Sequence, residues 1–224
     1  MEQCEILAIF ESLVPSHVAC ALASISHGST SPYAAENMAM RKAVAKRRCE
    51  FFAGRKAARQ ALGKLGIEPL SIPMGVQRDP LWPNGIVGAI THTQYHAVAI
   101  VASANHFKGV GLDLEKNGRI SEALATEIEA EAGDLNSDTK DRLTSQGICA
   151  HTLRYSAKES GFKAYFPAYK HFLAYRDVSC TVDLTTNSFT LRADEALETQ
   201  IHEHRLVKGM FSCTGPYLAT FAWC

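Results

Sequence analysis

Two carboxylates alternate with apolar residues in the segment 110–115 (VGLDLE). On an extended strand successive side chains point to opposite faces, so Asp113 and Glu115 would share one face and the leucines the other. Two acids side by side repel each other unless water separates them or a cation binds between them. The pair therefore predicts a divalent-cation site, or, as the more common alternative for such a short pattern, a solvated strand with ordinary surface acids.

Lysine and glutamate side chains gather in a segment predicted to be helical from about 148 to 166 and to stop at Pro167 (RYSAKESGFKAYFP covers its second part). Glu159 and Lys163 are neighbours on such a helix, so they could form no more than a surface ion pair. Alternatively, Glu159 could add a third carboxylate to an all-oxygen Mg²⁺ site. In that interpretation Lys158 and Lys163 would lie beside phosphate oxygens.

A hydroxyl and an imidazole stand next to each other at Thr91 and His92, between a loop rich in Gly and Pro and the predicted strand 97–102 (AVAIVA). Such a junction, with backbone N–H groups available, can bind a phosphate. The alternative is that His92 is a turn histidine with local hydrogen bonds. We interpret His96 as structural.

The basic residues concentrate in the segment 34–65, which is rich in alanine, lacks proline and predicts one or two helices ending near Gly66. Arg47 and Arg55 are about two helical turns apart and so lie roughly on one face. Guanidinium groups held there could bind a phosphate in a bidentate manner, although a charge-rich helix is usually a solvated face. Arg78, in the following loop, is a further candidate cation.

The order of the predicted elements indicates an α+β fold of two similar halves. Proline and glycine predict a loop over 67–88, and Ser121 could cap a helix over 121–132. Several short runs rich in β-branched and aromatic residues from 178 to the end predict an antiparallel meander. We expect the two halves to meet near residues 103–109.

The composition excludes several classes of protein. The 224 residues are 46% hydrophobic, enough for a packed core, and 23 Lys and Arg balance 23 Asp and Glu, so no nucleic-acid partner is expected. Seven scattered cysteines without a C-x-x-C pair argue against a disulfide framework or a zinc site and favour the reducing cytoplasm. Neither a signal peptide nor a transmembrane segment is expected.

Four segments together resemble one family: KRRCEFFAGRKAARQAL, RDPLWPNGIVGAITHT, GVGLDLE and RYSAKESGFKAYFP. In this order and approximate spacing they are similar to the 4′-phosphopantetheinyl transferases of the surfactin/enterobactin-synthetase-activating (Sfp/EntD-like) type. The resemblance implies two α/β halves related by a pseudo-twofold. It implies that residues 1–106 bind coenzyme A phosphate and that residues 107–224 bind Mg²⁺ and carry out catalysis.

The resemblance also implies the reaction and its residues. The family transfers the 4′-phosphopantetheine group from coenzyme A to a serine of an apo acyl or peptidyl carrier protein and releases adenosine 3′,5′-bisphosphate. The resemblance implies that Asp113, Glu115 and Glu159 bind Mg²⁺, or Mn²⁺ in its place. It also implies that Glu159 and Lys163 are the catalytic residues. The implied coenzyme A contacts are Arg47, Arg55, Arg78, Thr91, His92, Lys158 and Lys163. We expect a monomer with internal pseudo-symmetry.

Several alternatives stay open at this level. Glu159 could deprotonate the serine directly or through water, but a metal-bound water or the surroundings of the carrier serine could serve instead. Ala89 stands where the family usually has serine, and the loop 133–147, where the family contacts its carrier, has no clear motif match. The same acids could serve a Mg²⁺-dependent nucleotide phosphodiesterase or pyrophosphatase, or the chain could be a non-catalytic coenzyme A-binding module.

Overall fold

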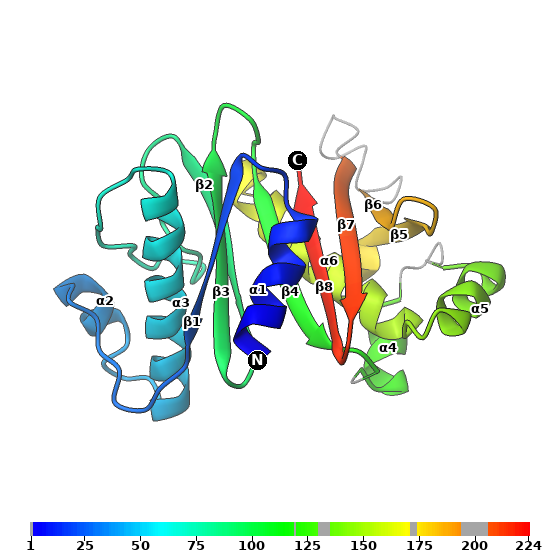
Figure 1. Ribbon diagram of the computed structural model, residues 1–224, viewed down its shortest axis with the longest axis horizontal. Helices are drawn as coiled ribbons and strands as arrows, with labels where there is room; N and C mark the ends of the chain where they lie inside the picture. Colours follow the sequence, from blue (N-terminus) through cyan, green and yellow to red (C-terminus); the bar gives the residue numbers. More distant parts are fainter. Residues whose placement is uncertain (1, 119, 130–134, 171–173, 194–205) are drawn as a thin grey trace. The chain divides into compact units, whose positions relative to one another are not determined.

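The computed structural model describes residues 2–118, 120–129, 135–170, 174–193 and 206–224 (Figure 1). The chain divides into two compact units, Met1–Phe107 and Lys108–Cys224, next to the boundary expected from the sequence. Both units contain helices and antiparallel strands, which confirms the predicted α+β class. Among the described residues no helix is long and apolar enough to cross a membrane.

The N-terminal unit packs a long helix on a three-stranded antiparallel sheet of order β1-β3-β2. In Figure 1 the helix, α3, is drawn in cyan beside β1 and β3. The elements are α1 (Glu2–Leu13), β1 (Val18–Ser24), α2 (Ala34–Ala39), α3 (Ala45–Lys64), β2 (Ile86–His92) and β3 (His96–Ser103). The predicted basic helix is therefore two helices, and the positive φ of 75° at Gly66 ends the second, as glycine allows at a helix C-terminus.

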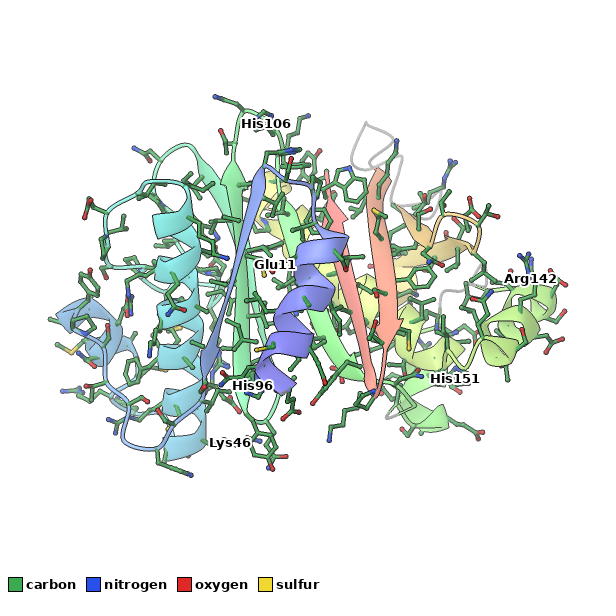
Figure 2. All side chains as sticks on the ribbon, viewed as in Figure 1. Glu11, Lys46, His96, His106, Arg142 and His151 are labelled. Atoms are coloured by element: carbon green, nitrogen blue, oxygen red, sulfur yellow. The ribbon has the colours of Figure 1, made fainter. Side chains whose placement is uncertain are left out.

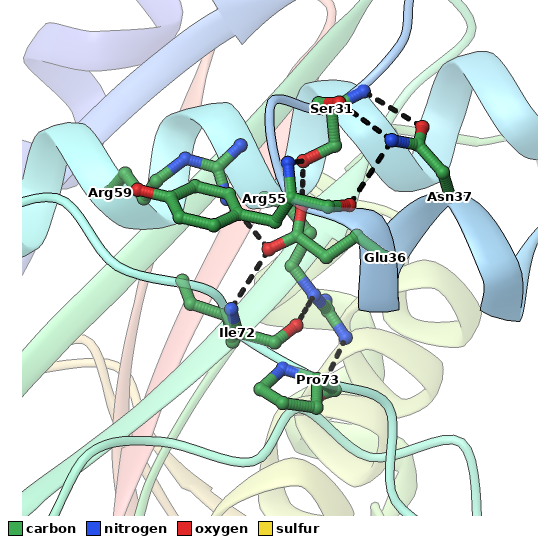
Figure 3. A network of polar contacts seen from close by, with 8 residues as sticks. Ser31, Glu36, Asn37, Arg55, Arg59, Ile72 and Pro73 are labelled. Carbon is green, nitrogen blue, oxygen red and sulfur yellow. Dashed lines mark hydrogen bonds and ion pairs between the residues drawn. The ribbon is translucent and has the colours of Figure 1, made fainter.

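A buried carboxylate ties α2, α3 and the loop after α3 together (Figure 3). Glu36 is 0% exposed and accepts hydrogen bonds from Arg59 at 2.8 Å and from the backbone N–H of Ile72 at 2.8 Å. The hydroxyl of Ser31 donates to its second oxygen. A buried charge with this many partners fixes the loop against the helix.

The C-terminal unit packs a second long helix on a five-stranded antiparallel sheet of order β4-β8-β7-β6-β5. The helices are α4 (Glu122–Glu127), α5 (Ser137–Ser145), α6 (Ala150–Tyr169) and the 3₁₀ turn η1 (Tyr175–Asp177). The strands are β4 (Val110–Lys116), β5 (Val178–Asp183), β6 (Ser188–Ala193), β7 (Leu206–Thr214) and β8 (Tyr217–Trp223), so the predicted C-terminal meander is confirmed.

Helix α6 approaches β4 closely because Gly111 has no side chain. A Cβ at Gly111 would lie 1.9 Å from the carbonyl oxygen of Ser160, far closer than the 3.0 Å that real Cβ atoms keep from non-bonded neighbours. The contact between α6 and β4 therefore depends on glycine at this position. It brings the helix motif and the strand motif of the sequence to one place.

Two helix boundaries differ from the sequence expectation. The helix begun by Ser121, whose hydroxyl accepts from the N–H of Leu124, ends at Glu127, and residues 130–132 of the predicted helix lie outside the described residues. Pro167 does not stop α6, which continues to Tyr169. The proline lies in the last turn, where only one hydrogen bond is lost, and Lys170 then closes the helix in the left-handed region with φ of 54°.

Each unit thus places one helix of 20 residues against one antiparallel sheet. This arrangement fits two similar halves, although the first sheet has three strands and the second five. The pseudo-twofold relation between the halves stays a prediction.

Candidate active site

The acids of β4 and the charged residues of α6 meet in the C-terminal unit. Asp113 is 4% exposed, and its Oδ1 accepts a hydrogen bond of 2.7 Å from Nζ of Lys163. The same ammonium lies 3.5 Å from Oε2 of Glu159. The structure therefore brings together Asp113 and two residues of α6, the farther of which follows it by 50 positions.

The electrostatics keep this ammonium charged. Burial alone would lower the pKa of Lys163, but the carboxylates of Asp113 and Glu159 outweigh burial and raise the pKa. Lys163 is therefore a cation held between two acids at neutral pH.

Two tyrosines complete the cluster, and the sequence analysis assigned neither of them. Tyr175 of η1 donates its phenol hydrogen to Oε1 of Glu159. Burial, together with the negative charges of Glu159, Asp113 and Glu115, raises the pKa of Tyr155 to about 12. All three predicted metal carboxylates thus act on one phenol. The spacing of Tyr155 four residues before Glu159 was a usable helical signal, whereas no motif surrounds Tyr175.

Lys158 lies beside Glu159 in sequence but points elsewhere. Its side chain is buried, and Nζ donates to the backbone carbonyls of Ile128 at 2.8 Å and Tyr175 at 2.9 Å. The ammonium therefore holds the chain segment that presents the Tyr175 phenol. A contact of Lys158 with pyrophosphate stays a prediction.

An apolar pocket adjoins this cluster within the C-terminal unit. Its lining includes Lys158, Phe162, Tyr165, Tyr175, Leu191 and Val207. Since Tyr175 also contacts Glu159, the pocket lies next to the acids. Its walls suit an apolar or amide-containing chain better than a phosphate.

In the N-terminal unit, Arg47 and His92 meet at a carboxylate that the sequence analysis did not assign. Oε2 of Glu50 lies 3.7 Å from the Arg47 guanidinium and 3.8 Å from Nε2 of His92. Thr91 is buried beside His92 near the end of β2. Figure 2 shows Lys46, at the start of α3, and His96, at the start of β3, at the same end of the unit.

The two other predicted arginines have different surroundings. Arg55 is 5% exposed, and its Nε donates to the carbonyl of Ile72 at 2.7 Å, as Figure 3 shows. Burial lowers the pKa of Arg55 to about 10. Arg78 lies in an exposed turn with a left-handed φ of 66°. The geometry of Arg55 thus favours a role in fixing the loop, and phosphate contacts by either arginine stay predictions.

The donor chemistry of Asp113, Glu115 and Glu159 fits a hard cation. Their ligand atoms are all oxygen, which is what Mg²⁺ and Mn²⁺ prefer. Among the residues that the structure describes, no three His, Cys, Asp or Glu side chains are arranged to hold a metal ion. The Lys163 ammonium contacts two of these three acids instead.

Comparison with known proteins identifies the family. Residues 34–102 match the N-terminal domain of 4′-phosphopantetheinyl transferases, and residues 109–222 match the 4′-phosphopantetheinyl transferase superfamily. The chain belongs to this superfamily. The resemblance stated from the four sequence segments is thereby confirmed.

Individual relatives agree with this assignment. The chain is 28% identical over 215 residues to 4′-phosphopantetheinyl transferase Npt of Nocardia iowensis, covering 95% of this chain and 92% of Npt. It is 32% identical over 153 residues to PptT of Mycobacterium tuberculosis, covering 67% and 65%. Enterobactin synthase component D of Salmonella typhimurium is 37% identical over 130 residues, covering 56% of this chain and 51% of that protein. The chain is a 4′-phosphopantetheinyl transferase, and coenzyme A is the donor substrate of its family.

Proposed function

We propose that this transferase moves the phosphopantetheine group of coenzyme A onto an acyl or peptidyl carrier serine, with its chemistry in the acid cluster of the C-terminal unit. The observation that carries the proposal is the ammonium of Lys163, which contacts both Asp113 and Glu159. A cation between two acids is suited to a reaction in which negative charge moves between phosphate oxygens.

The reaction requires a base and a stabilised leaving group. The serine oxygen attacks the phosphate that bears the pantetheine, and the bond from this phosphate to the bridging oxygen breaks. The serine proton passes to Glu159, directly or through water, and Lys163 stabilises the charge on adenosine 3′,5′-bisphosphate. Glu159 suits this role because its side chain is 22% exposed and Tyr175 and Lys163 orient its two oxygens.

Asp113, Glu115 and Glu159 would hold Mg²⁺, or Mn²⁺ in its place. When bound, this ion supplies Lewis-acid neutralisation of the pyrophosphate charge. The negative charges of the three acids on Tyr155 support the assignment, since they indicate that all three face one region. Lys163 would share two of these acids with the ion.

The N-terminal unit would bind the 3′-phosphate end of coenzyme A through Arg47 and His92, with Thr91, Arg55 and Arg78 as further predicted contacts. The first turn of α3 supports this, because it contains Lys46, Arg47 and Arg48 and no acid. Cations at a helix N-terminus oppose the helix dipole, and a bound anion relieves that repulsion.

The apolar pocket beside Tyr175 would contact part of the pantetheine arm. The arm combines methyl groups with amides, and the lining of the pocket offers aromatic and aliphatic side chains with the Lys158 ammonium at one side. Because the pocket adjoins Glu159 through Tyr175, an arm placed there would have its phosphate near the acids.

The decisive test is the mass of the carrier. The protein is incubated with coenzyme A, Mg²⁺ and a panel of apo carrier proteins, and each carrier is weighed. A gain of one phosphopantetheine group supports the proposal and identifies the carrier class. Hydrolysis of coenzyme A without any carrier gain would favour a phosphodiesterase, and binding without turnover would favour a non-catalytic module.

The compartment and the oligomeric state are also proposals. All seven cysteines are free, and this supports a reducing compartment such as the cytoplasm. We propose a monomer, which the molar mass in solution would test.

A further inference from the structure

Glu50 is a carboxylate placed where the proposed function requires an anion of the substrate. It lies on α3 within 3.9 Å of the Lys46 ammonium, 3.7 Å of the Arg47 guanidinium and 3.8 Å of the His92 imidazole. Its side chain is 10% exposed, whereas that of Arg47 is 46% and that of His92 is 36% exposed. The carboxylate therefore lies beneath groups that remain accessible from solvent.

Stability alone does not account for this arrangement. Ion pairs with a solvent-accessible partner contribute little to stability, and the distances to Glu50 are long for a charge-assisted hydrogen bond. Glu50 also lies beyond the first turn of α3. At that position the helix dipole no longer stabilises an acid strongly, because its effect falls off within the first turn. Its main electrostatic effect is thus on the cations of the site.

We propose that Glu50 limits the affinity of the N-terminal unit for the 3′-phosphate, which coenzyme A and adenosine 3′,5′-bisphosphate share. The inference rests on the proposed function. A bound phosphate would draw on Arg47 and His92, which already lie beside Glu50, and the two anions would repel each other.

This weakening serves turnover because the 3′-phosphate stays with the leaving product. Any contact that binds this phosphate equally well in coenzyme A and in the product adds affinity without accelerating the chemical step. It also slows product release, a step that limits the turnover of many enzymes. A carboxylate beneath the cations lets the site bind the 3′-phosphate but keeps the affinity low enough for the product to be released.

The test is calorimetric titration of the full chain, with Mg²⁺ constant, using coenzyme A, dephospho-coenzyme A and adenosine 3′,5′-bisphosphate. Glu50→Gln preserves the size of the side chain and removes its charge. Glu11→Gln is the matched control, since it removes one charge from an exposed pair with Lys64 in the same unit (Glu11 is labelled in Figure 2). Circular dichroism verifies the fold of both variants.

We expect Glu50→Gln to bind coenzyme A and adenosine 3′,5′-bisphosphate about tenfold more tightly, with dephospho-coenzyme A unchanged and Glu11→Gln like the parent. Weaker binding of coenzyme A would mean that Glu50 positions Arg47 and His92, and would overturn the inference. Unchanged binding, or equal tightening of all three ligands, would overturn it as well. If the parent itself does not distinguish coenzyme A from dephospho-coenzyme A, the proposed phosphate site fails instead.

Discussion

Lys163 donates a hydrogen bond of 2.7 Å to Asp113 and so joins the middle of α6 to β4 at the acid cluster. Asp113 is buried, and burying a carboxylate costs folding free energy unless a partner is paired with it. The Lys163 ammonium therefore supplies the partner that this buried carboxylate needs. Glu159, one turn before Lys163 on α6, contacts the same ammonium.

Asp113→Asn tests this charge. The variant keeps the shape of the side chain but removes a charge from the predicted metal site, so we expect kcat for carrier modification to fall about a hundredfold or more. The measurement is the rate of carrier mass gain. Asp183→Asn, an exposed acid of β5, is the control and should keep its rate. Near-normal turnover of Asp113→Asn, with its fold intact, would refute the metal assignment.

Tyr175→Phe tests the orientation of Glu159. The variant removes the phenol that donates to Oε1 of Glu159. A hydrogen bond to a charged group contributes about 1.5–3 kcal/mol, so kcat should fall roughly tenfold to a hundredfold. Tyr95→Phe, in an exposed turn of the N-terminal unit, is the matched control. A variant that changes only the KM for the carrier would place Tyr175 in carrier binding instead.

Local pattern predicts which acids share a face of a strand or helix, but it does not predict their partners. The alternation around Asp113 and the helical spacing of Glu159 and Lys163 depend on neighbours in sequence, and the structure brings these three residues together. Tyr175 reaches Glu159 from a segment without a motif, so only the tertiary fold reveals the contact. Glu50 resembles an ordinary helix-surface acid because it follows two basic residues at helical spacing.

Helical spacing predicts which residues share one face of a helix, but it does not predict which segment packs against that face. Arg55 lies two turns after Arg47, yet its guanidinium is buried on the carbonyls of Ile72 and Pro73. The loop that covers it is rich in proline and glycine, and sequence reasoning could not place that loop against the helix. The same limit applies to Lys158, whose burial depends on backbone carbonyls from two distant segments.

We therefore expect different defects in two variants: Arg55→Ala should lose stability, and Arg47→Ala should lose affinity for coenzyme A. Arg55→Ala leaves the carbonyls of Ile72 and Pro73 without their donor, so the free energy of unfolding should fall by about 1–3 kcal/mol. Arg47→Ala removes a half-exposed side chain, so stability should change by less than about 0.5 kcal/mol while the KM for coenzyme A rises. Urea unfolding and steady-state kinetics measure the two effects. Equal loss of stability in both variants would contradict this division.

Glu36→Ala tests the buried network of the N-terminal unit. It leaves the Arg59 guanidinium, whose side chain is 12% exposed, without its carboxylate, and breaking such a pair typically costs about 3–5 kcal/mol. Urea unfolding of the variant should therefore show a large loss. Glu11→Ala removes an exposed acid paired with Lys64 and should cost less than about 1 kcal/mol. Comparable losses would mean that the network contributes no more than a surface pair.

The buried thiol of Cys20 gives a prediction with a defined pH range. Burial raises the pKa of Cys20 from 9.0 to about 12, so this thiol stays neutral in the folded protein at pH values where the unfolded chain ionises it. The unfolded state then binds fewer protons, and the Cys20 contribution to folding free energy should decline as pH rises from 9 toward 12. At pH 8 a thiol reagent should modify the exposed Cys4 at once and Cys20 only after urea is added, as peptide mass mapping would show. Rapid modification of Cys20 in the native protein would contradict its burial.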